Sequence, residues 1–233
     1  MKIFGNGFIA KNLKKKKIRF LDNYVIYAAG ISNSKTLNIK ELKKEITTFN
    51  NFIKKYNRSK IIIYISSMSI FDKYLKQNEY IKNKLKIESI IKKKVKKFII
   101  IRLTQIVGKN RNPNTITNFI YNNIKNNKNL NLWKGHKRNL VDIEDVVKIL
   151  KTIVKKKFLK NKILNIYNTK SISVKRIVLI MCKILKKNIK LNEIKLRQKT
   201  KQFNYKINSK NYEFGYLFEK QNYNENILMK YYK

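Results

Sequence analysis

The stretch KIFGNGFIAKNL, residues 2–13, decides how this chain of 233 residues folds. A strand-like run, KIF, leads directly into the pattern G-x-G-x-x-A, and a helix is predicted over residues 7–16. Gly5 permits a tight turn, Gly7 leaves space for the backbone to approach a phosphate group, and Ala10 is small enough for close packing of helix on strand. The start of the helix adds N–H groups and the positive end of its dipole. These residues predict a pyrophosphate-binding turn.

Beyond this turn, short β-rich runs alternate with longer amphipathic segments, which is typical of an α/β fold. The predicted strands are residues 2–4, 24–29, 61–66, 98–103 and 163–167. Further helices are predicted at residues 39–56, 79–97, 142–154 and 173–186. Several strands are apolar on both faces. We therefore expect a parallel sheet covered by helices and joined by right-handed crossovers.

The predicted helix 39–56 has a clear buried face, because its apolar residues recur at spacings of three and four, and the predicted helix 79–97 behaves similarly. In residues 39–56 the stripe consists of Ile39, Leu42, Ile46, Phe49 and Ile53. In residues 79–97 it runs through Ile81, Leu85, Ile91 and Val95. From about residue 104 to 141 the alternation weakens, which predicts an excursion from the sheet. The last 30 residues, rich in Tyr and Asn, show poor periodicity.

The net charge of +43 is the most conspicuous feature of the composition. A basic surface attracts phosphates, so nucleic-acid binding is one interpretation. However, Lys residues outnumber Arg residues by 49 to 7 and occur in every segment of the chain. A base bias in the coding sequence explains such an excess of Lys more simply than selection for phosphate contacts, which favours the forked guanidinium of Arg. The charge by itself therefore does not favour nucleic acid as the partner.

Other features of the composition concern the compartment. Hydrophobic residues make up 43% of the chain, which predicts a packed core. The longest apolar runs have strand length, well short of the roughly 20 residues that span a bilayer. Met1 leads straight into a strand-like run with no charged leader, so we expect a cytoplasmic protein without a membrane segment. Cys182 is the single cysteine and is expected to be an ordinary core residue. No metal-ligand spacing is present.

A second motif follows the predicted strand 61–66, which ends in the serines of SSMS, residues 66–69. Tyr80 and Lys84 lie one helical turn apart on the next predicted helix, so that they share a face. This spacing alone is weak, because chance predicts about as many pairs as the chain contains. The other pairs are Tyr56/Lys60, Tyr121/Lys125 and Tyr216/Lys220. Only Tyr80/Lys84 follows a serine-ended strand, at the carboxyl edge where open α/β sheets bind ligands.

Together these motifs resemble the NAD(P)-dependent epimerase/dehydratase branch of the short-chain dehydrogenase/reductase superfamily, over nearly the whole chain. The similar segments are GNGFIAKNL (5–13), VIYAAG (25–30), ISSMSIF (65–71), YIKNKLKIE (80–88), IIIRLTQIVGKN (99–110) and RNLVDIEDVV (138–147). The resemblance implies a Rossmann-type, doubly wound parallel sheet with a small C-terminal substrate lobe. It also implies the division of the chain: residues 1–105 with 138–168 would bind the cofactor, and residues 106–137 with 169–233 would form the substrate-binding lobe.

The resemblance also implies the chemistry of the site. Tyr80 would act as base or acid on a sugar hydroxyl, Lys84 would hold the nicotinamide ribose and stabilise the phenolate, and Ser67 would hydrogen-bond the reacting oxygen. Arg138 is a candidate for the diphosphate of a nucleotide-sugar substrate, since a forked cation suits two phosphate groups. The cofactor, NAD or NADP, would be held by Gly5, Gly7, Phe8, Ile9, Ala10, Ala28, Ala29, Gly30 and Lys84.

The expected activity is therefore that of an NAD(P)-dependent nucleotide-sugar epimerase, dehydratase or reductase, with a place in polysaccharide biosynthesis. The segment between Ala10 and Val25 departs from the family, because its 14 residues leave no room for the strand, helix and strand that usually select the adenosine ribose. Asp22 is the only acid there, so the choice between NAD and NADP stays open. Because of this shortening, a second interpretation stays open, namely a non-catalytic binding protein with the same fold. A homodimer also remains open.

Overall fold

The structure is a computed structural model that describes residues 2–16, 23–31, 38–72, 78–110, 112–155, 160–195 and 221–233. The chain divides into two compact units. The first unit comprises Met1–Thr104 and Glu144–Ile166, and the second comprises Gln105–Ile143 and Tyr167–Lys233. The division of labour expected from the sequence, with the cofactor in one part and the substrate in the other, stays a prediction.

The first unit is built on a parallel sheet of five strands. In order across the sheet, these are β1 (Lys2–Phe4), β2 (Tyr24–Tyr27), β3 (Ile61–Ser67), β4 (Phe98–Leu103) and β9 (Lys162–Ile166). Phe4 lies beside Tyr27, and Tyr27 lies beside Tyr64. Because all the strands are parallel, their carboxyl ends meet at one edge of the sheet. The predicted α/β class and all five predicted strands are confirmed.

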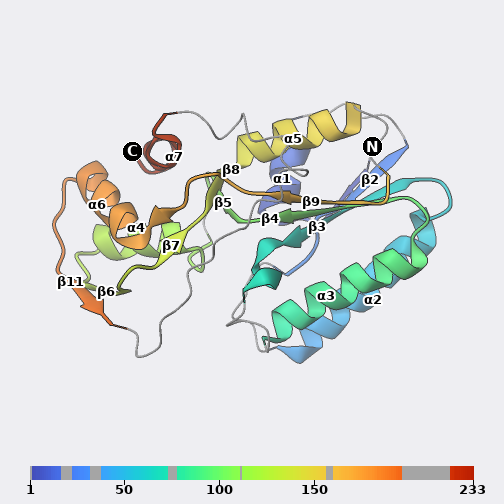
Figure 1. Cartoon of the computed structure of the whole chain (residues 1–233), viewed down its shortest axis with the longest axis horizontal. Coiled ribbons are helices and arrows are strands. Elements are labelled where there is room, and N and C mark those ends of the chain that lie inside the picture. Colours follow the sequence, from blue (N-terminus) through green and yellow to red (C-terminus); the bar gives the residue numbers. More distant parts are fainter. Residues whose placement is uncertain are drawn as a thin grey trace. The chain divides into compact units, whose positions relative to one another are not determined.

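Helices cover both faces of this sheet, as Figure 1 shows. Helices α1 (Phe8–Lys15) and α5 (Ile143–Lys155) lie on one face, where Lys16 forms an ion pair with Glu144. Helices α2 (Ile39–Tyr56) and α3 (Glu79–Lys94) pack together on the other face. A short 3-10 helix, η1 (Met68–Phe71), links β3 to the segment before α3. The sheet is therefore the middle layer of three.

The core between the sheet and α2 and α3 is rich in aromatic side chains. The ring of Tyr27 lies 4.9 Å from that of Phe49 and 5.0 Å from that of Phe52, edge to face in both cases. Phe49 lies 5.5 Å from the ring of Tyr64 on the neighbouring strand. Such pairs contribute about 0.5–1.5 kcal/mol beyond the burial of their area. They fix α2 against the strands that lead into the candidate site.

The first crossover of the sheet departs from the expected handedness. Strands β1, β2 and β3 follow one another in the same direction across the sheet, but α1 and α2 lie on opposite faces. The connections β1–α1–β2 and β2–α2–β3 therefore have opposite hands, and the expectation of right-handed crossovers throughout is wrong. In the sequence only a short segment separates α1 from β2, and β1 lies at the edge of the sheet among the described strands.

The second unit consists of three helices and three pairs of short strands in the described part of the chain. The helices are α4 (Ile116–Lys125), α6 (Val174–Leu185) and α7 (Tyr223–Tyr232). The strand pairs are β5 (Gln105–Val107) with β8 (Leu140–Asp142), β6 (Leu130–Trp133) with β11 (Leu191–Ile194), and β7 (Lys137–Arg138) with β10 (Ile172–Ser173). Of these elements, the sequence patterns predicted only α6.

The C-terminal helix α7 is tied to β8 through one buried carboxylate. Asp142 accepts hydrogen bonds from the hydroxyl of Tyr231 at 2.6 Å and from Nζ of Lys230 at 2.9 Å. The backbone N–H of Asp142 donates to the hydroxyl of Tyr223 at 2.9 Å.

None of the helices in the described ranges combines the length and the apolar character needed to cross a bilayer.

Candidate active site

The glycine-rich turn lies between β1 and α1, at the carboxyl edge of the sheet. Gly5 has a φ of +124°, and a Cβ at this position would overlap the backbone oxygen of Ala28. Gly7 is exposed, and the nearest atom to a Cβ there would be the same oxygen at 4.0 Å. Gly7 precedes α1 without a capping side chain, so the first N–H groups of the helix are available to an anion. The turn therefore fits a phosphate group.

The other residues predicted for this turn have a structural part as well. Ala10 is fully buried, while Phe8 and Ile9 are half-buried at the start of α1. Lys14, which the sequence patterns did not single out, folds back onto the turn. Its Nζ donates to the backbone oxygen of Gly5 at 2.7 Å and to Oδ1 of Asn6 at 3.1 Å. A positive charge thus lies beside the candidate phosphate site.

The segment that follows β2 lies next to this turn, and its residues Ala28, Ala29 and Gly30 are half-buried. The backbone N–H of Ala28 donates to the oxygen of Phe4 at 2.8 Å, which extends the pairing of β1 with β2. A Cβ at Gly30 would overlap Nζ of Lys84 and lie 2.9 Å from Oε1 of Glu45. The segment thus joins the glycine turn to the predicted catalytic lysine.

The two serines at the end of β3 have different partners. The hydroxyl of Ser67 accepts a hydrogen bond from the backbone N–H of Ser69 at 3.1 Å and begins η1. The hydroxyl of Ser66 is buried and donates to Oε1 of Glu88 at 2.7 Å. Glu88 is also held by the guanidinium of Arg102, at 3.0 and 2.5 Å. Ser66 therefore belongs to a buried network, whereas Ser67 lies at the partly exposed end of the strand.

Tyr80 and Lys84 occupy the first turns of α3, which begins after Asn78. The side chain of Asn78 accepts a hydrogen bond from the backbone N–H of Tyr80 at 2.9 Å and so fixes the start of the helix. Nζ of Lys84 lies 5.4 Å from the centre of the Tyr80 ring and 5.8 Å from that of Tyr64. The predicted pair is thus brought together on one face of α3.

The ammonium group of Lys84 also forms a buried ion pair that the sequence patterns did not reveal. Its Nζ lies 2.8 Å from Oε1 of Glu45 on α2, and both side chains are only 3% exposed. Burial lowers the pKa of Lys84, but interactions with Tyr64, Tyr80 and Glu45 outweigh burial and raise the pKa above its ordinary value. Lys84 therefore stays charged at neutral pH.

The remaining predicted residues and tyrosine–lysine pairs belong to other elements of the chain. Arg138, in the second unit, is half-buried, and its Nη1 donates to the backbone oxygen of Lys137 at 3.0 Å. Tyr56 ends α2, and Lys60 follows it in a loop. Tyr121 belongs to α4 of the second unit, where its ring lies 5.1 Å from that of Tyr232. Asp22, Tyr216 and Lys220 lie outside the described residues.

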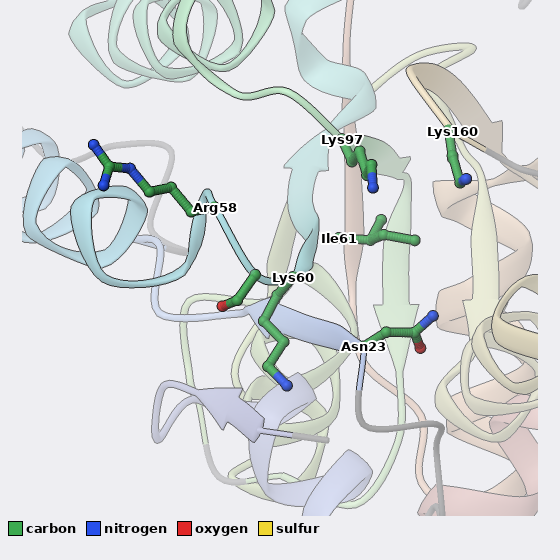
Figure 2. A pocket seen from close by; sticks show the side chains of 7 residues that line it. Asn23, Arg58, Lys60, Ile61, Lys97 and Lys160 are labelled. Carbon is green, nitrogen blue, oxygen red and sulfur yellow. The ribbon is translucent and has the colours of Figure 1, made fainter.

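A hollow of about 250 Å³ lies at the opposite, amino edge of the sheet (Figure 2). It is lined by Asn23, Arg58, Ser59, Lys60, Ile61, Lys97 and Lys160. These residues lie in or beside the loops that lead into the strands, and Figure 2 shows the guanidinium of Arg58 directed away from the other labelled side chains. In a chain with a net charge of +43, cations gather on most surfaces. None of the predicted site residues lines this hollow.

The carboxyl edge of the first unit therefore gathers the groups that a proton transfer beside a bound dinucleotide requires. A phenol and an ammonium lie on one helix face, a hydroxyl ends the neighbouring strand, and an uncapped helix start lies beside two glycine-containing turns. In open α/β sheets, ligands bind along this edge. The donors fit a dinucleotide, with backbone N–H groups for the pyrophosphate and an ammonium for a ribose hydroxyl.

Several solved structures share this fold. RMD from Pseudomonas aeruginosa, in complex with NADPH, is 13% identical with a TM-score of 0.68, and the alignment covers 86% of this chain and 88% of that one. UDP-glucose 4-epimerase from Thermotoga maritima, with UDP-glucose, is 13% identical with a TM-score of 0.67, and the alignment covers 87% of this chain and 88% of that one. dTDP-4-dehydrorhamnose reductase from Bacillus anthracis, in complex with NADP, is 15% identical with a TM-score of 0.67, and the alignment covers 83% of this chain and 84% of that one. These likenesses show a Rossmann-like fold.

A search of curated proteins by sequence finds no match. Residues 22–166, however, match the model of a family described as the NAD dependent epimerase/dehydratase family. The match begins after α1, so the glycine turn is outside it, but it includes the AAG segment, the serine-ended strand and α3. Because it spans more than half of the 233 residues, the chain belongs to the NAD-dependent epimerase/dehydratase family.

Proposed function

We propose that the protein is an NAD(P)-dependent enzyme that acts on a nucleotide-activated sugar by reversible hydride transfer, as an epimerase, a dehydratase or a reductase. The arrangement of Tyr80 and Lys84 carries this proposal. The ammonium lies 5.4 Å from the centre of the phenol ring, on a helix that follows a strand ending in Ser67. The same strand end adjoins the edge that carries the glycine turn.

Each of the three side chains has a separate part in the proposed chemistry. Tyr80 exchanges a proton with the reacting oxygen of the sugar, and the hydroxyl of Ser67 donates a hydrogen bond to the same oxygen. Lys84 donates to the ribose, and its charge stabilises the negative oxygen that forms when Tyr80 gives up its proton. The bound dinucleotide supplies the hydride donor or acceptor.

The backbone of the first unit would hold the dinucleotide. Gly5–Ala10 offers the uncapped N-terminus of α1 to the pyrophosphate, with Phe8 and Ile9 in its first turn, and Lys14 adds a positive charge beside it. Ala28–Gly30 lies between this turn and Lys84. Both NAD and NADP are candidates, since relatives of this fold were solved with each.

The proposed substrate is a nucleotide sugar. This class is suggested by relatives whose structures were solved with UDP-glucose or with UDP. Arg138, in the second unit, is the candidate for the diphosphate, because a guanidinium binds two phosphate oxygens at once. A reaction of this class places the protein in nucleotide-sugar metabolism.

One observation favours the alternative, a binding protein of the same fold without catalysis. The side chain of Lys84 is only 3% exposed and is engaged with Glu45. Two measurements together decide between the enzyme and the binding protein. The first is a titration with NADH and NADPH followed by fluorescence, and the second is turnover on UDP- and dTDP-sugars. Cofactor binding without turnover on any sugar would favour the alternative.

The substitution Tyr80→Phe tests the catalytic assignment. It should preserve the fold and cofactor affinity and lower turnover by about 10²–10⁴-fold, which is the usual contribution of a positioned proton-transfer group. Tyr121→Phe is the matched control, because Tyr121 also precedes a lysine by four residues but lies on α4. Turnover unchanged by Tyr80→Phe would remove Tyr80 from the mechanism.

A further inference from the structure

A single buried carboxylate joins α2, α3 and the Gly30 turn. Oε1 of Glu45 accepts a hydrogen bond from Nζ of Lys84 at 2.8 Å. Its Oε2 accepts from Nδ2 of Asn83 at 3.1 Å and from the backbone N–H of Ile31 at 3.2 Å. Donors from two separate parts of the chain thus converge on Glu45, at the point where the cofactor segment meets the catalytic helix.

This carboxylate is out of place on purely structural grounds. It lies on the face of α2 that is otherwise apolar, with Leu42 and Phe49 buried on either side in sequence. Replacing a buried ion pair by apolar residues of similar size is often neutral or stabilising, because both charges lose their hydration on burial. Stability alone therefore gives no reason for an acid at this position. Its ion pair with Lys84 instead indicates a role in the candidate active site.

The groups that face Lys84 come from four elements. They are Tyr27 on β2, Glu45 on α2, Tyr64 on β3 and Tyr80 on α3. Burial raises the pKa of Tyr27 and of Tyr64 well above the ordinary value, so both phenols stay neutral through pH 9.5. Among these groups Glu45 is the carboxylate, and it is the partner that can offset the buried charge of Lys84.

We propose that Glu45 is a positioning residue that keeps Lys84 charged and fixed against the Gly30 turn, ready to donate to the ribose of the dinucleotide. This inference rests on the proposed function. Glu45 touches no reacting atom and acts only through Lys84 and through the backbone at Ile31. The ammonium has three N–H donors, and Glu45 takes one of them while setting the direction of the others.

The first test needs no cofactor and uses Glu45→Gln, which keeps the size of the side chain and removes its charge. Without the carboxylate, the buried ammonium loses the anionic partner that offsets its lost hydration, so we expect the pKa of Lys84 to fall below its value in the unfolded chain. The unfolded state then binds more protons. Stability of the variant should therefore rise with pH. Its Tm should lie about 5 °C or more below wild type at pH 7, and the deficit should shrink by pH 9.5.

The wild-type protein and two variants provide the controls for this measurement. In wild type the raised pKa of Lys84 keeps the ion pair intact below the ordinary lysine pKa, so this pair adds no pH dependence between pH 7 and 9.5. Glu41→Gln makes the same chemical change on an exposed face of α2. It should lower Tm only slightly, through the lost interaction with the helix dipole, and leave the pH profile between pH 7 and 9.5 unchanged. Glu45→Asp retains the charge and should restore a flat profile.

The second test measures dissociation constants for NADH and NADPH over the same pH range. Affinity of Glu45→Gln should fall about tenfold or more as Lys84 loses its proton, while that of wild type and of Glu45→Asp stays constant. A Tm deficit of Glu45→Gln that is independent of pH would overturn the proposal. So would a pH-independent affinity of this variant. If wild type binds neither cofactor at millimolar concentration, the proposed function fails, and the Tm profile alone decides whether Glu45 keeps Lys84 charged.

Discussion

Gly5 and Gly7 both belong to the G-x-G-x-x-A pattern, but the reasons for a glycine differ between the two positions. Gly5 has a positive φ, and any side chain there would meet the backbone of Ala28, so the fold itself requires glycine. Gly7 has a φ of −72° and a ψ of 179°, which any residue adopts, and it faces open space. The protein alone does not need glycine at position 7, which is the result expected if a ligand occupies that space.

This difference predicts that substitution of Gly5 destabilises the fold, whereas substitution of Gly7 does not. Gly5→Ala should lower the free energy of unfolding by about 3 kcal/mol, because it combines backbone strain with a steric clash. Gly7→Ala should change it by less than about 0.5 kcal/mol. Urea titrations measure both values. Gly7→Val should remain folded but lose NADH binding almost completely, and tight binding by this variant would contradict the assigned role of the turn.

Residues of the candidate site differ in how far the sequence alone predicts them. Tyr80 and Lys84 lie one helical turn apart, so the helix itself brings them together, and Ser67 ends the strand that precedes this helix in sequence. Glu45 is 39 residues from Lys84, and nothing near it in the sequence marks it as buried. Lys14 is one of four consecutive lysines, and in a chain this rich in lysine the sequence does not distinguish one functional lysine from the others.

Among the elements, α3 shows how an ion pair can override hydrophobic periodicity. The spacing of its apolar residues predicts Leu85 on the buried stripe, but Leu85 is 45% exposed and Lys84 is 3% exposed. The helix is rotated so that Ile81, Ile87 and Ile91 face the sheet, which also brings Lys84 to Glu45. The predicted stripe of α3 is therefore wrong at Leu85, and the predicted helix is right.

The rotation of α3 makes a direct prediction about stability. Leu85→Gln should change the free energy of unfolding by less than about 1 kcal/mol, because nearly half of the side chain is exposed to water. Ile87→Ala should cost about 2–5 kcal/mol, because Ile87 is fully buried and its removal leaves a cavity. Chemical denaturation of the two variants measures these costs. Comparable losses would mean that α3 presents a different face to the sheet.

Elements of the second unit were harder to predict for a physical reason. Helix α4 is begun by Thr115, and a buried Asn118 is held by the hydroxyl of Tyr232 from α7. Helix α7 buries two tyrosines beside Ile227 and Leu228. These faces combine polar and aromatic side chains whose hydrogen bonds come from distant segments. A search for apolar periodicity gives little signal for such helices.

On the scale of the whole molecule, the order of the strands could not be predicted from the sequence patterns. The alternation of strands and helices predicts a parallel sheet, but pairing between strands depends on contacts far apart in the chain. Strand β1 pairs only with β2 among the described residues, because the segment after α1 is too short to add a neighbour on the other side. The glycine turn therefore sits at the edge strand of the sheet.

A turn at the rim of the sheet also has a kinetic consequence for the proposed cofactor. Because the sheet continues from the turn only on the β2 side among the described strands, we expect the adenosine half of the proposed cofactor to make few protein contacts, and fewer contacts appear chiefly as faster dissociation. An epimerase must retain its reduced cofactor until the hydride returns, whereas a reductase exchanges it in every cycle. Fast release would therefore favour the reductase among the three proposed activities. Stopped-flow measurements should show that NADH and NADPH leave the protein faster than turnover. Release slower than turnover, with an epimerised sugar as product, would contradict this expectation.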